Sequence, residues 1–247
     1  TLDRSSAASD VYKRQDLDTI QSSLIKDAGE ASTALPSSTA LFTIETDRWN
    51  DYLSKAPKHT YDVEAAKALL AEAGYPDGFT CSLMISDSSL RNSMALAIQE
   101  QLAQIGITVN INKVSTDEHT AYQFGEKLDA NGLRDYDMIM AGWEADYPDP
   151  SGNLTPLYQG GNSSNAAAYQ NDEVDKLIAD QAQSSDPTQR NDDMFQAFDI
   201  ITQDVPYVFL YYPVKNIAMN KAYTGVTMNA SWIWNIHFQS VHPVSEG

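Results

Sequence analysis

The chain has 247 residues, of which 42% are hydrophobic and 20% are charged, a composition typical of a globular protein rather than a disordered chain. Its 34 acidic and 16 basic residues give a formal net charge of −18 at pH 7. No nucleic-acid partner is therefore expected, because the phosphate backbone would repel the chain, and anionic membrane surfaces are disfavoured for the same reason.

Residues 1–15 differ from the rest of the chain and are predicted to be extraneous to the fold. They contain three of the sixteen basic residues and show no hydrophobic periodicity. The string SSAASDVYKRQ resembles adapter-derived sequence at the ends of translated metagenomic assemblies. The N-terminus has no apolar signal core, so the protein is either cytosolic or its true beginning is missing.

The first half of the remaining chain alternates helix and strand patterns. Asp62 is a candidate N-cap for a helix that Gly74 ends, and a turn is predicted at 75–78. A second helix carries apolar residues at helical spacing from Met94 to Ile105. The other elements predicted here are the strands Phe79–Ser86 and Ile107–Val114 and a helix around Asp117–Leu128.

The second half continues this alternation. The segment Tyr136–Gly142 is predicted to be a strand, and Asn171 caps a predicted helix. Another helix start is predicted at residues 186–189. Asp186 is the candidate N-cap, Pro187 is the proline at N1, and Gln189 is the candidate capping-box glutamine. Two further strands, joined at Pro213, are predicted at Tyr207–Tyr212 and Val214–Met219. Alternating strands and helices predict an α/β layered architecture.

The segment from Tyr136 to Asp149, YDMIMAGWEADYPD, sets a carboxylate among aromatic rings at a strand end. The rings of Trp143 and Tyr147 can exclude water and offer π-faces, while Asp146 can supply charge-assisted hydrogen bonds, an arrangement that suits a cationic amine. The alternative is an ordinary solvated turn whose aromatic residues belong to the core. Asp149 has a structural explanation as a helix cap before a proline, whereas Asp146 has no obvious structural role.

Catalytic and metal-binding motifs are absent from the sequence. It contains no P-loop, no GxSxG nucleophile elbow and no HExxH zinc motif, and its four histidines are scattered. Cys81 is the only cysteine, and its apolar neighbours predict a buried thiol. The longest apolar stretch, Tyr207–Val214, is too short to cross a bilayer. We therefore expect no catalytic residue, no metal, no cofactor and no stable membrane insertion of this segment.

Four long segments share an order and spacing that is typical of one protein family. They are residues 61–79 (YDVEAAKALLAEAGYPDGF), 136–150 (YDMIMAGWEADYPDP), 160–190 and 205–226. Over residues 16–247 the chain resembles the oligopeptide and dipeptide solute-binding proteins of ABC importers, bacterial extracellular solute-binding protein family 5. The resemblance implies an α/β fold: a truncated, periplasmic-binding-protein-like lobe of class II type, with a mixed sheet flanked by helices.

Members of that family are bilobal clamps longer than this chain. The resemblance therefore implies that residues 16–222 form the second, C-terminal ligand-binding lobe and that residues 223–247 return toward a first lobe. The first lobe and the secretion signal would be missing from this chain, which accounts for the absent signal core without making the protein cytosolic.

The resemblance also assigns candidate ligand-binding residues. In peptide-binding members, the aspartate of a W-x-x-D segment pairs with the peptide's α-ammonium, and this pattern matches Trp143 and Asp146. Asp146 is thus the implied amine anchor and Trp143 an implied pocket wall. Tyr147 adjoins them but could also face the core. Trp232 and Trp234 either line the cleft from the returning segment or serve packing.

The function implied is that of the extracytoplasmic substrate-binding component of an ABC importer, which captures peptides by lobe closure rather than by catalysis. The expected partners are a peptide ligand and the permease subunits, and the full-length protein is expected to be a monomer. It would reside in the periplasm or be lipid-anchored on the outer face of the cytoplasmic membrane. Alternatives are a clamp for a metal chelate, haem or oligosaccharide, a non-transport sensor or adhesin, and a peptide hydrolase, although no nucleophile–base pair supports the last.

Overall fold

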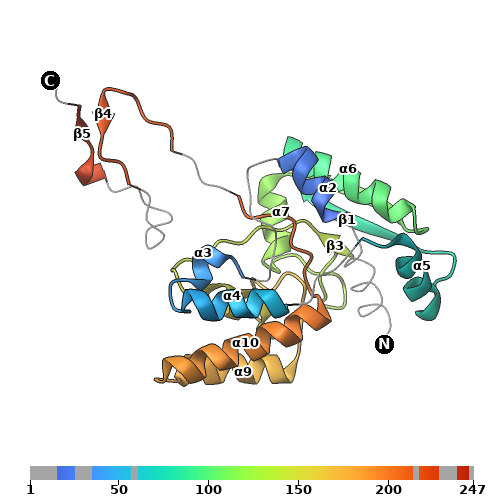
Figure 1. Cartoon of the computed structure of the whole chain (residues 1–247). Coiled ribbons are helices and arrows are strands. Elements are labelled where there is room, and N and C mark those ends of the chain that lie inside the picture. The colour runs from blue at the N-terminus through green and yellow to red at the C-terminus, as the bar shows by residue number, and fades with distance from the viewer. Residues whose placement is uncertain (1–15, 26–34, 57–60, 214–216, 228–237, 245–247) are drawn as a thin grey trace.

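The computed structural model describes residues 16–25, 35–56, 61–213, 217–227 and 238–244, and the prediction for residues 1–15 lies outside them. The described residues form a sheet unit, a helical unit and a C-terminal segment that extends away from both (Figure 1). Each of the two units has its own cluster of buried apolar side chains.

The sheet unit is built on three parallel strands in the order β2-β1-β3. These strands are β1 (Thr80–Ser86), β2 (Thr108–Val114) and β3 (Met138–Ile139). The buried odd-numbered residues of β1, Cys81, Leu83 and Ile85, belong to one core with buried residues of the helices α5 (Val63–Glu72) and α6 (Ser89–Ala103). Because successive side chains of a strand point to opposite faces, Met84 faces away from that core, on the side where α7 (Thr116–Gln123) contacts β1.

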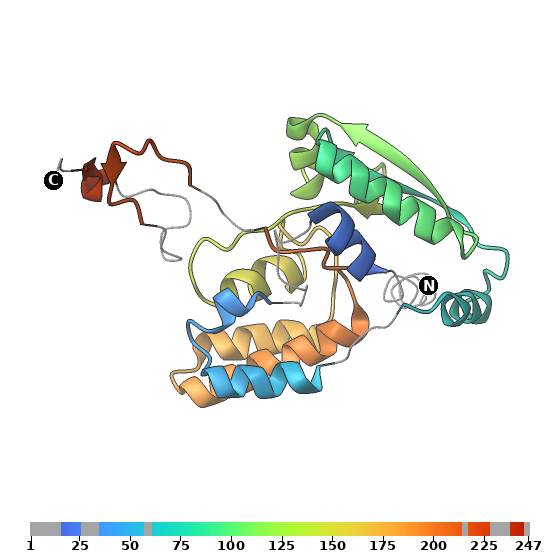
Figure 2. The ribbon, with the colours of Figure 1, turned by 45° about the horizontal axis from the view of Figure 1, so that its top comes forward.

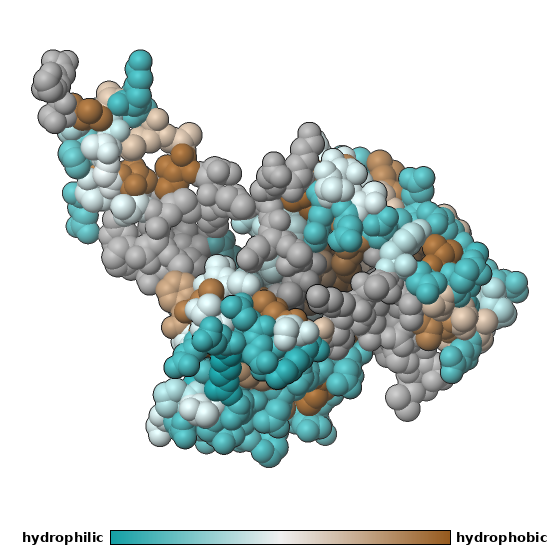
Figure 3. Space-filling view, viewed as in Figure 1, coloured by the Kyte–Doolittle hydropathy of each residue, from teal (hydrophilic) through white to brown (hydrophobic). Residues whose placement is uncertain are grey.

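The helical unit encloses the second core. Its helices are α3 (Ser37–Ala40), α4 (Thr46–Lys55), α8 (Ser151–Tyr158), α9 (Asp172–Gln183) and α10 (Pro187–Asp204). Figure 2 shows α4, α9 and α10 lying side by side. The largest side chains that they bury completely are Trp49, Tyr158 and Phe198. The outward faces of these helices are mostly hydrophilic (Figure 3), as expected for amphipathic helices around a core.

The helix starts predicted from capping residues are confirmed. Asp62 accepts a hydrogen bond from Ala65 N at the start of α5, and Asn171 caps α9 in the same way. Asp186 caps α10, with Pro187 in the first turn. The predicted capping box is wrong, however, because Gln189 donates its side-chain amide to Asp193 Oδ1 (2.8 Å), one turn further along the helix.

The two strands predicted after residue 206 are not formed among the described residues. Residues 207–212 are irregular, and 214–216 lie outside the described part of the chain. Tyr207 and Phe209 pack against the helical core, whereas Leu210 and Tyr211 pack against the sheet core. The segment therefore ties the two cores together instead of adding a strand, and the predicted mixed sheet is, in the described residues, a parallel one.

The N-terminal and C-terminal segments differ in how firmly they are held. The short helix α2 (Leu17–Ile20) and the following π-helical turn (Gln21–Ile25) bury Ile20 and Ile25 in the sheet core. In contrast, no described residue after 216 is buried. The C-terminal strands β4 (Tyr223–Thr224) and β5 (His242–Pro243) pair with each other, far from the sheet unit, and hydrophobic residues are exposed around them (Figures 1 and 3).

Arg134 joins the end of α7 to the loop before α9. Its guanidinium donates to the carbonyls of Tyr122 and Gln123 (both 3.2 Å) and to those of Ser163 and Asn165 (both 3.0 Å). The first two carbonyls belong to the last turn of α7, where a cation also complements the helix dipole.

Replacing Arg134 by Met, which keeps the length of the side chain, is expected to lower the free energy of unfolding by about 2–3 kcal/mol, because four carbonyls, three of them in partly buried hydrogen bonds, lose a charged donor. Urea denaturation would measure this change. Lys127→Met is the control, because Lys127 makes an exposed ion pair with Glu118 and should cost less than about 1 kcal/mol. Equal effects of the two substitutions would contradict the importance of Arg134.

Val205 ends α10 in the left-handed region, with φ 46° and ψ 59°, directly before Pro206. A β-branched residue is strained in this region, and glycine is the usual residue there. Val205→Gly is therefore expected to raise the free energy of unfolding by about 0.5–1 kcal/mol, since relief of strain exceeds the lost burial. Thermal denaturation would test this expectation. Val208→Gly is the control: residue 208 has no positive φ, so this substitution should lower the free energy of unfolding. If both substitutions lower it, Val205 is not strained.

Candidate ligand-binding site

The carboxyl ends of β1 and β3 lie next to each other and form the centre of the candidate site. Met140 N donates to Met84 O (2.9 Å), so the chain after β3 continues alongside the end of β1. The chain runs from β1 through α6 to β2, which lies on one side of β1. It then runs through α7 to β3, which lies on the opposite side of β1. This reversal of strand order is the position where open α/β sheets bind ligands.

The loop after β3, residues 141–150, contains the predicted ligand residues. The Trp143 indole N–H donates to Gly152 O (2.9 Å), and its ring packs against the helical core. Ala145 is buried, whereas Asp146 and Tyr147 are exposed. In the described part of the chain, no hydrogen bond or ion pair engages the carboxylate of Asp146. Trp143 thus anchors the loop that presents Asp146; Trp232 and Trp234 lie outside the described residues.

Asp149 fixes the far end of the same loop. Its Oδ1 atom accepts hydrogen bonds from Ser151 N (2.9 Å) and Ser151 Oγ (2.6 Å) and forms an ion pair with Arg190 Nη2 (2.6 Å). Partial burial alone would raise the pKa of Asp149, but Arg190 and the Ser151 donors outweigh it and lower the pKa below 3.8. The predicted N-cap is displaced by one residue, because the N-cap of α8 is Pro150, but Asp149 still accepts the hydrogen bond of Ser151 N at the helix start. The salt bridge links Asp149 to α10.

A second group of polar side chains surrounds the strand ends. Arg91, in the first turns of α6, donates to Ser86 Oγ (2.7 Å), and Gln123 of α7 donates to Gly142 O (2.8 Å). His119 of α7 is 3% exposed and lies 3.2 Å from Met140 O through Nε2. Burial and the neighbouring Arg91 lower the pKa of His119. Sequence reasoning missed this group, because its members are distant in sequence and form no motif.

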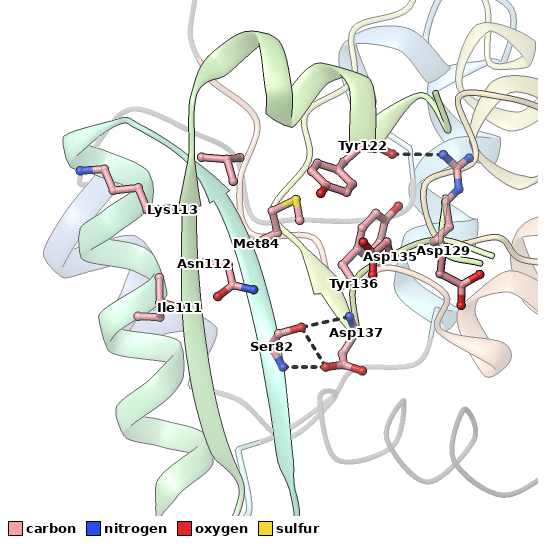
Figure 4. Close-up of a pocket in the computed structure, with 12 residues that line it drawn as sticks. Ser82, Met84, Ile111, Asn112, Lys113, Tyr122, Asp129, Asp135, Tyr136 and Asp137 are labelled. Atoms are coloured by element: carbon pink, nitrogen blue, oxygen red, sulfur yellow. Dashed lines mark hydrogen bonds between the residues drawn. The ribbon is translucent and has the colours of Figure 1, made fainter. Parts of the chain in front are cut away.

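A polar hollow of about 680 Å³ lies on the face of the sheet opposite the core formed with α5 and α6, between β1, β2 and residues 129–137 (Figure 4). Its most prominent charged groups have structural roles. Asp137 accepts hydrogen bonds from Ser82 N (2.7 Å) and Ser82 Oγ (2.8 Å), and Asp129 accepts from Asn131 N and Leu133 N. The Asp137 contacts hold the loop against β1 and the Asp129 contacts shape the loop itself, so the hollow is a weaker candidate than the strand ends.

Three further findings concern metal ligands, the single cysteine and membrane-spanning helices. No cluster of three or more histidine, cysteine, aspartate or glutamate side chains within the described ranges is arranged to hold a metal ion. Cys81 is buried as predicted, and burial raises the pKa of its thiol to about 11, so the thiol stays protonated near neutral pH. None of the described helices is long and apolar enough to cross a bilayer.

A parallel sheet with helices packed on it and an attached helical unit have the architecture of a lobe of the periplasmic-binding-protein type. Residues 16–165 match the model of the bacterial extracellular solute-binding proteins, family 5 Middle. The chain therefore belongs to the bacterial extracellular solute-binding proteins of family 5.

Relatives and solved structures agree with this assignment. The chain is 33% identical over 170 residues to the glutathione-binding protein GsiB of Salmonella paratyphi A, covering 67% of this chain and 33% of that relative. Its fold is similar to the oligopeptide-binding protein AppA of Bacillus subtilis, in complex with a nonapeptide (TM-score 0.78, 23% identity, 98% of this chain and 48% of that chain). It is also similar to a dipeptide-binding protein from Pseudoalteromonas sp. SM9913, in complex with Met-Leu (TM-score 0.76, 23% identity, 98% and 46%). The chain spans about a third of the length of GsiB.

Proposed function

We propose that this chain is part of the extracytoplasmic substrate-binding component of an ABC importer and that it captures peptides. Membership of the solute-binding family supports this proposal, as do relatives and fold neighbours named for glutathione, a nonapeptide and a dipeptide. The mechanism is binding and closure, without a chemical step. Residues 16–222 are the ligand-binding lobe, and residues 223–247 return to a first lobe.

The central contact of the proposal is an ion pair between Asp146 and the α-ammonium of the peptide. The observation that supports it is a carboxylate that is exposed and unpartnered among the described residues, on a loop anchored by Trp143 and Asp149. Such anchoring pre-organises the carboxylate, which lowers the entropy lost on binding. Closure would then bury the ion pair and favour the closed state.

Titration calorimetry tests this function with a panel of free peptides: dipeptides, longer peptides and glutathione, each also in N-acetylated form. Free peptides are expected to bind and acetylated ones to bind far more weakly, because acetylation removes the ammonium charge. Equal binding of both forms would overturn the role of Asp146. Absence of binding throughout the panel would overturn peptide capture in favour of the alternative ligands, a metal chelate, haem or an oligosaccharide.

Transport partners and location follow from the same proposal. The permease subunits of an importer would receive the peptide, and the protein would act as a monomer in the periplasm or as a lipoprotein on the outer face of the cytoplasmic membrane. Affinity purification of the complete protein from its native membrane should recover permease subunits. Recovery of a signalling protein instead would favour the sensor alternative.

A further inference from the structure

Helix α7 buries two polar side chains, His119 and Gln123, which are 3% and 8% exposed. They are the only buried residues of this fully described helix, so α7 turns a polar face toward the protein. Because they are four residues apart, they lie one above the other on that face. Buried polar groups are costly without hydrogen-bond partners, so the partners of these two side chains identify the role of the face.

Both side chains contact backbone carbonyls of the segment that follows β3. Gln123 Nε2 donates to Gly142 O (2.8 Å), and His119 Nε2 lies 3.2 Å from Met140 O. A carbonyl oxygen only accepts hydrogen bonds, so the second contact requires the proton of His119 on Nε2. One face of α7 therefore supplies donors to two carbonyls that are two residues apart.

These donors continue the hydrogen bonding of β3 where its strand partner ends. Met140 N still donates to Met84 O (2.9 Å), but β1 ends two residues later, at Ser86. Beyond this bond, α7 provides the donors for the carbonyls of residues 140 and 142. Four residues of a helix advance about 6 Å, and two residues of an extended chain advance about 6.6 Å, so the two spacings match.

The segment held by α7 is the beginning of the loop that presents Asp146. Gly142 precedes Trp143, whose indole is already anchored, and Asp146 follows three residues later. The end of α7 is itself fixed, because Arg134 donates to Gln123 O (3.2 Å). The first residues of the loop are therefore tied to a helix that is held in place by a separate contact.

We propose that Gln123 and His119 are positioning residues for ligand binding, which hold the loop in place of β1 and thereby set the position of the Asp146 carboxylate. They act through the backbone of the loop and not by contact with the ligand. Fixing the carboxylate before binding reduces the entropy lost on binding. The ligand step of this inference rests on the proposed function, whereas the holding of the loop does not.

The first experiment follows the indole N–H of Trp143 by NMR on the full chain without ligand, with its resonance assigned from Trp143→Phe. Gln123→Met keeps the side-chain length and removes the donor. Hydrogen exchange at this N–H should become about fivefold faster, the factor that corresponds to one lost hydrogen bond. Circular dichroism would confirm that the variant folds.

Gln99→Met is the matched control for Gln123→Met. Gln99 Nε2 donates to Val109 O (2.7 Å), so this variant also loses a partly buried bond from glutamine to a backbone carbonyl, but on β2. It should leave the exchange at Trp143 unchanged. Equal exchange rates at Trp143 in the two variants would overturn the proposal.

Two substitutions of His119 separate its donor from its ring. His119→Phe keeps a ring without a donor and should also accelerate exchange at the Trp143 indole. His119→Gln loses the ring but carries an amide N–H that can reach Met140 O, so it should restore slow exchange. Exchange as fast in His119→Gln as in His119→Phe would contradict the role of His119 as a donor.

Titration calorimetry then connects the loop to the ligand. The unaltered chain is expected to bind alanyl-alanine more tightly than N-acetyl-alanyl-alanine, and Gln123→Met should reduce this preference about fivefold, the factor of the same lost hydrogen bond. Gln99→Met should leave the preference unchanged. Faster exchange at Trp143 with an undiminished preference would overturn the proposal. Faster exchange in a chain whose unaltered form binds no peptide would retain the holding of the loop and reject peptide capture.

Discussion

Replacing Asp146 by Asn is expected to weaken peptide binding by about 2–4 kcal/mol, the usual cost of leaving a charged partner buried and unpaired. The carboxylate is exposed in the ligand-free lobe, and its loop is anchored on both sides by other residues. The substitution should therefore change affinity while the fold is preserved. Titration calorimetry with a free peptide measures the change, and thermal denaturation checks the fold.

Asp135→Asn is the matched control for this experiment. Asp135 is also exposed, makes no side-chain hydrogen bond or ion pair with a described residue, and lines the polar hollow instead of the loop 141–150. It changes the net charge by the same amount, so any general electrostatic effect would appear in both variants. If Asp146→Asn and Asp135→Asn bind peptide equally well, Asp146 is not the amine anchor.

Replacing Arg190 by Leu is expected to lower the free energy of unfolding by about 2–3 kcal/mol, because Asp149 would remain partly buried without its cation. The side chains of this ion pair are only 22% and 20% exposed, respectively, so solvent screens their attraction weakly. The variant should also bind peptide less tightly, since Asp149 fixes the end of the loop that presents Asp146. Urea denaturation and calorimetry measure the two effects.

The Lys176–Asp180 pair provides the control for Arg190→Leu. This pair is solvent-exposed on α9, and Lys176→Leu should change stability by less than about 1 kcal/mol. Similar losses in both variants would show that the Arg190–Asp149 pair has no special role. The double variant Arg190→Leu, Asp149→Leu should recover part of the lost stability, because neither charge is then left alone.

The same ion pair predicts a dependence of stability on pH. Asp149 has a pKa lowered below 3.8 in the folded protein, so its contribution is fully present above its unfolded pKa. This contribution is lost as the pH falls through the lower, folded value. The difference in stability between the unaltered protein and Asp149→Asn should therefore be constant near neutral pH and shrink below about pH 4. A constant difference down to pH 2 would contradict the assigned ion pair.

The sequence by itself determined the local elements, because their signals are local. The N-caps Asp62, Asn171 and Asp186 stand where the helices begin, and the apolar spacing predicted α5, α6 and α10. The W-x-x-D pattern and three other segments also sufficed for the family, which the match over residues 16–165 confirmed. The role of Asp146 remains a prediction.

Only the tertiary structure decided how distant segments meet. Residues 207–212 have the composition of a strand, but two separate cores compete for their side chains, and the segment joins the cores instead of pairing. Arg91 and His119 are 28 residues apart on different helices, and they meet only because α6 and α7 pack on a common sheet. The contacts of His119 and Gln123 with the segment after β3 are likewise a property of three-dimensional proximity, since sequence spacing cannot show which carbonyls a side chain reaches after folding.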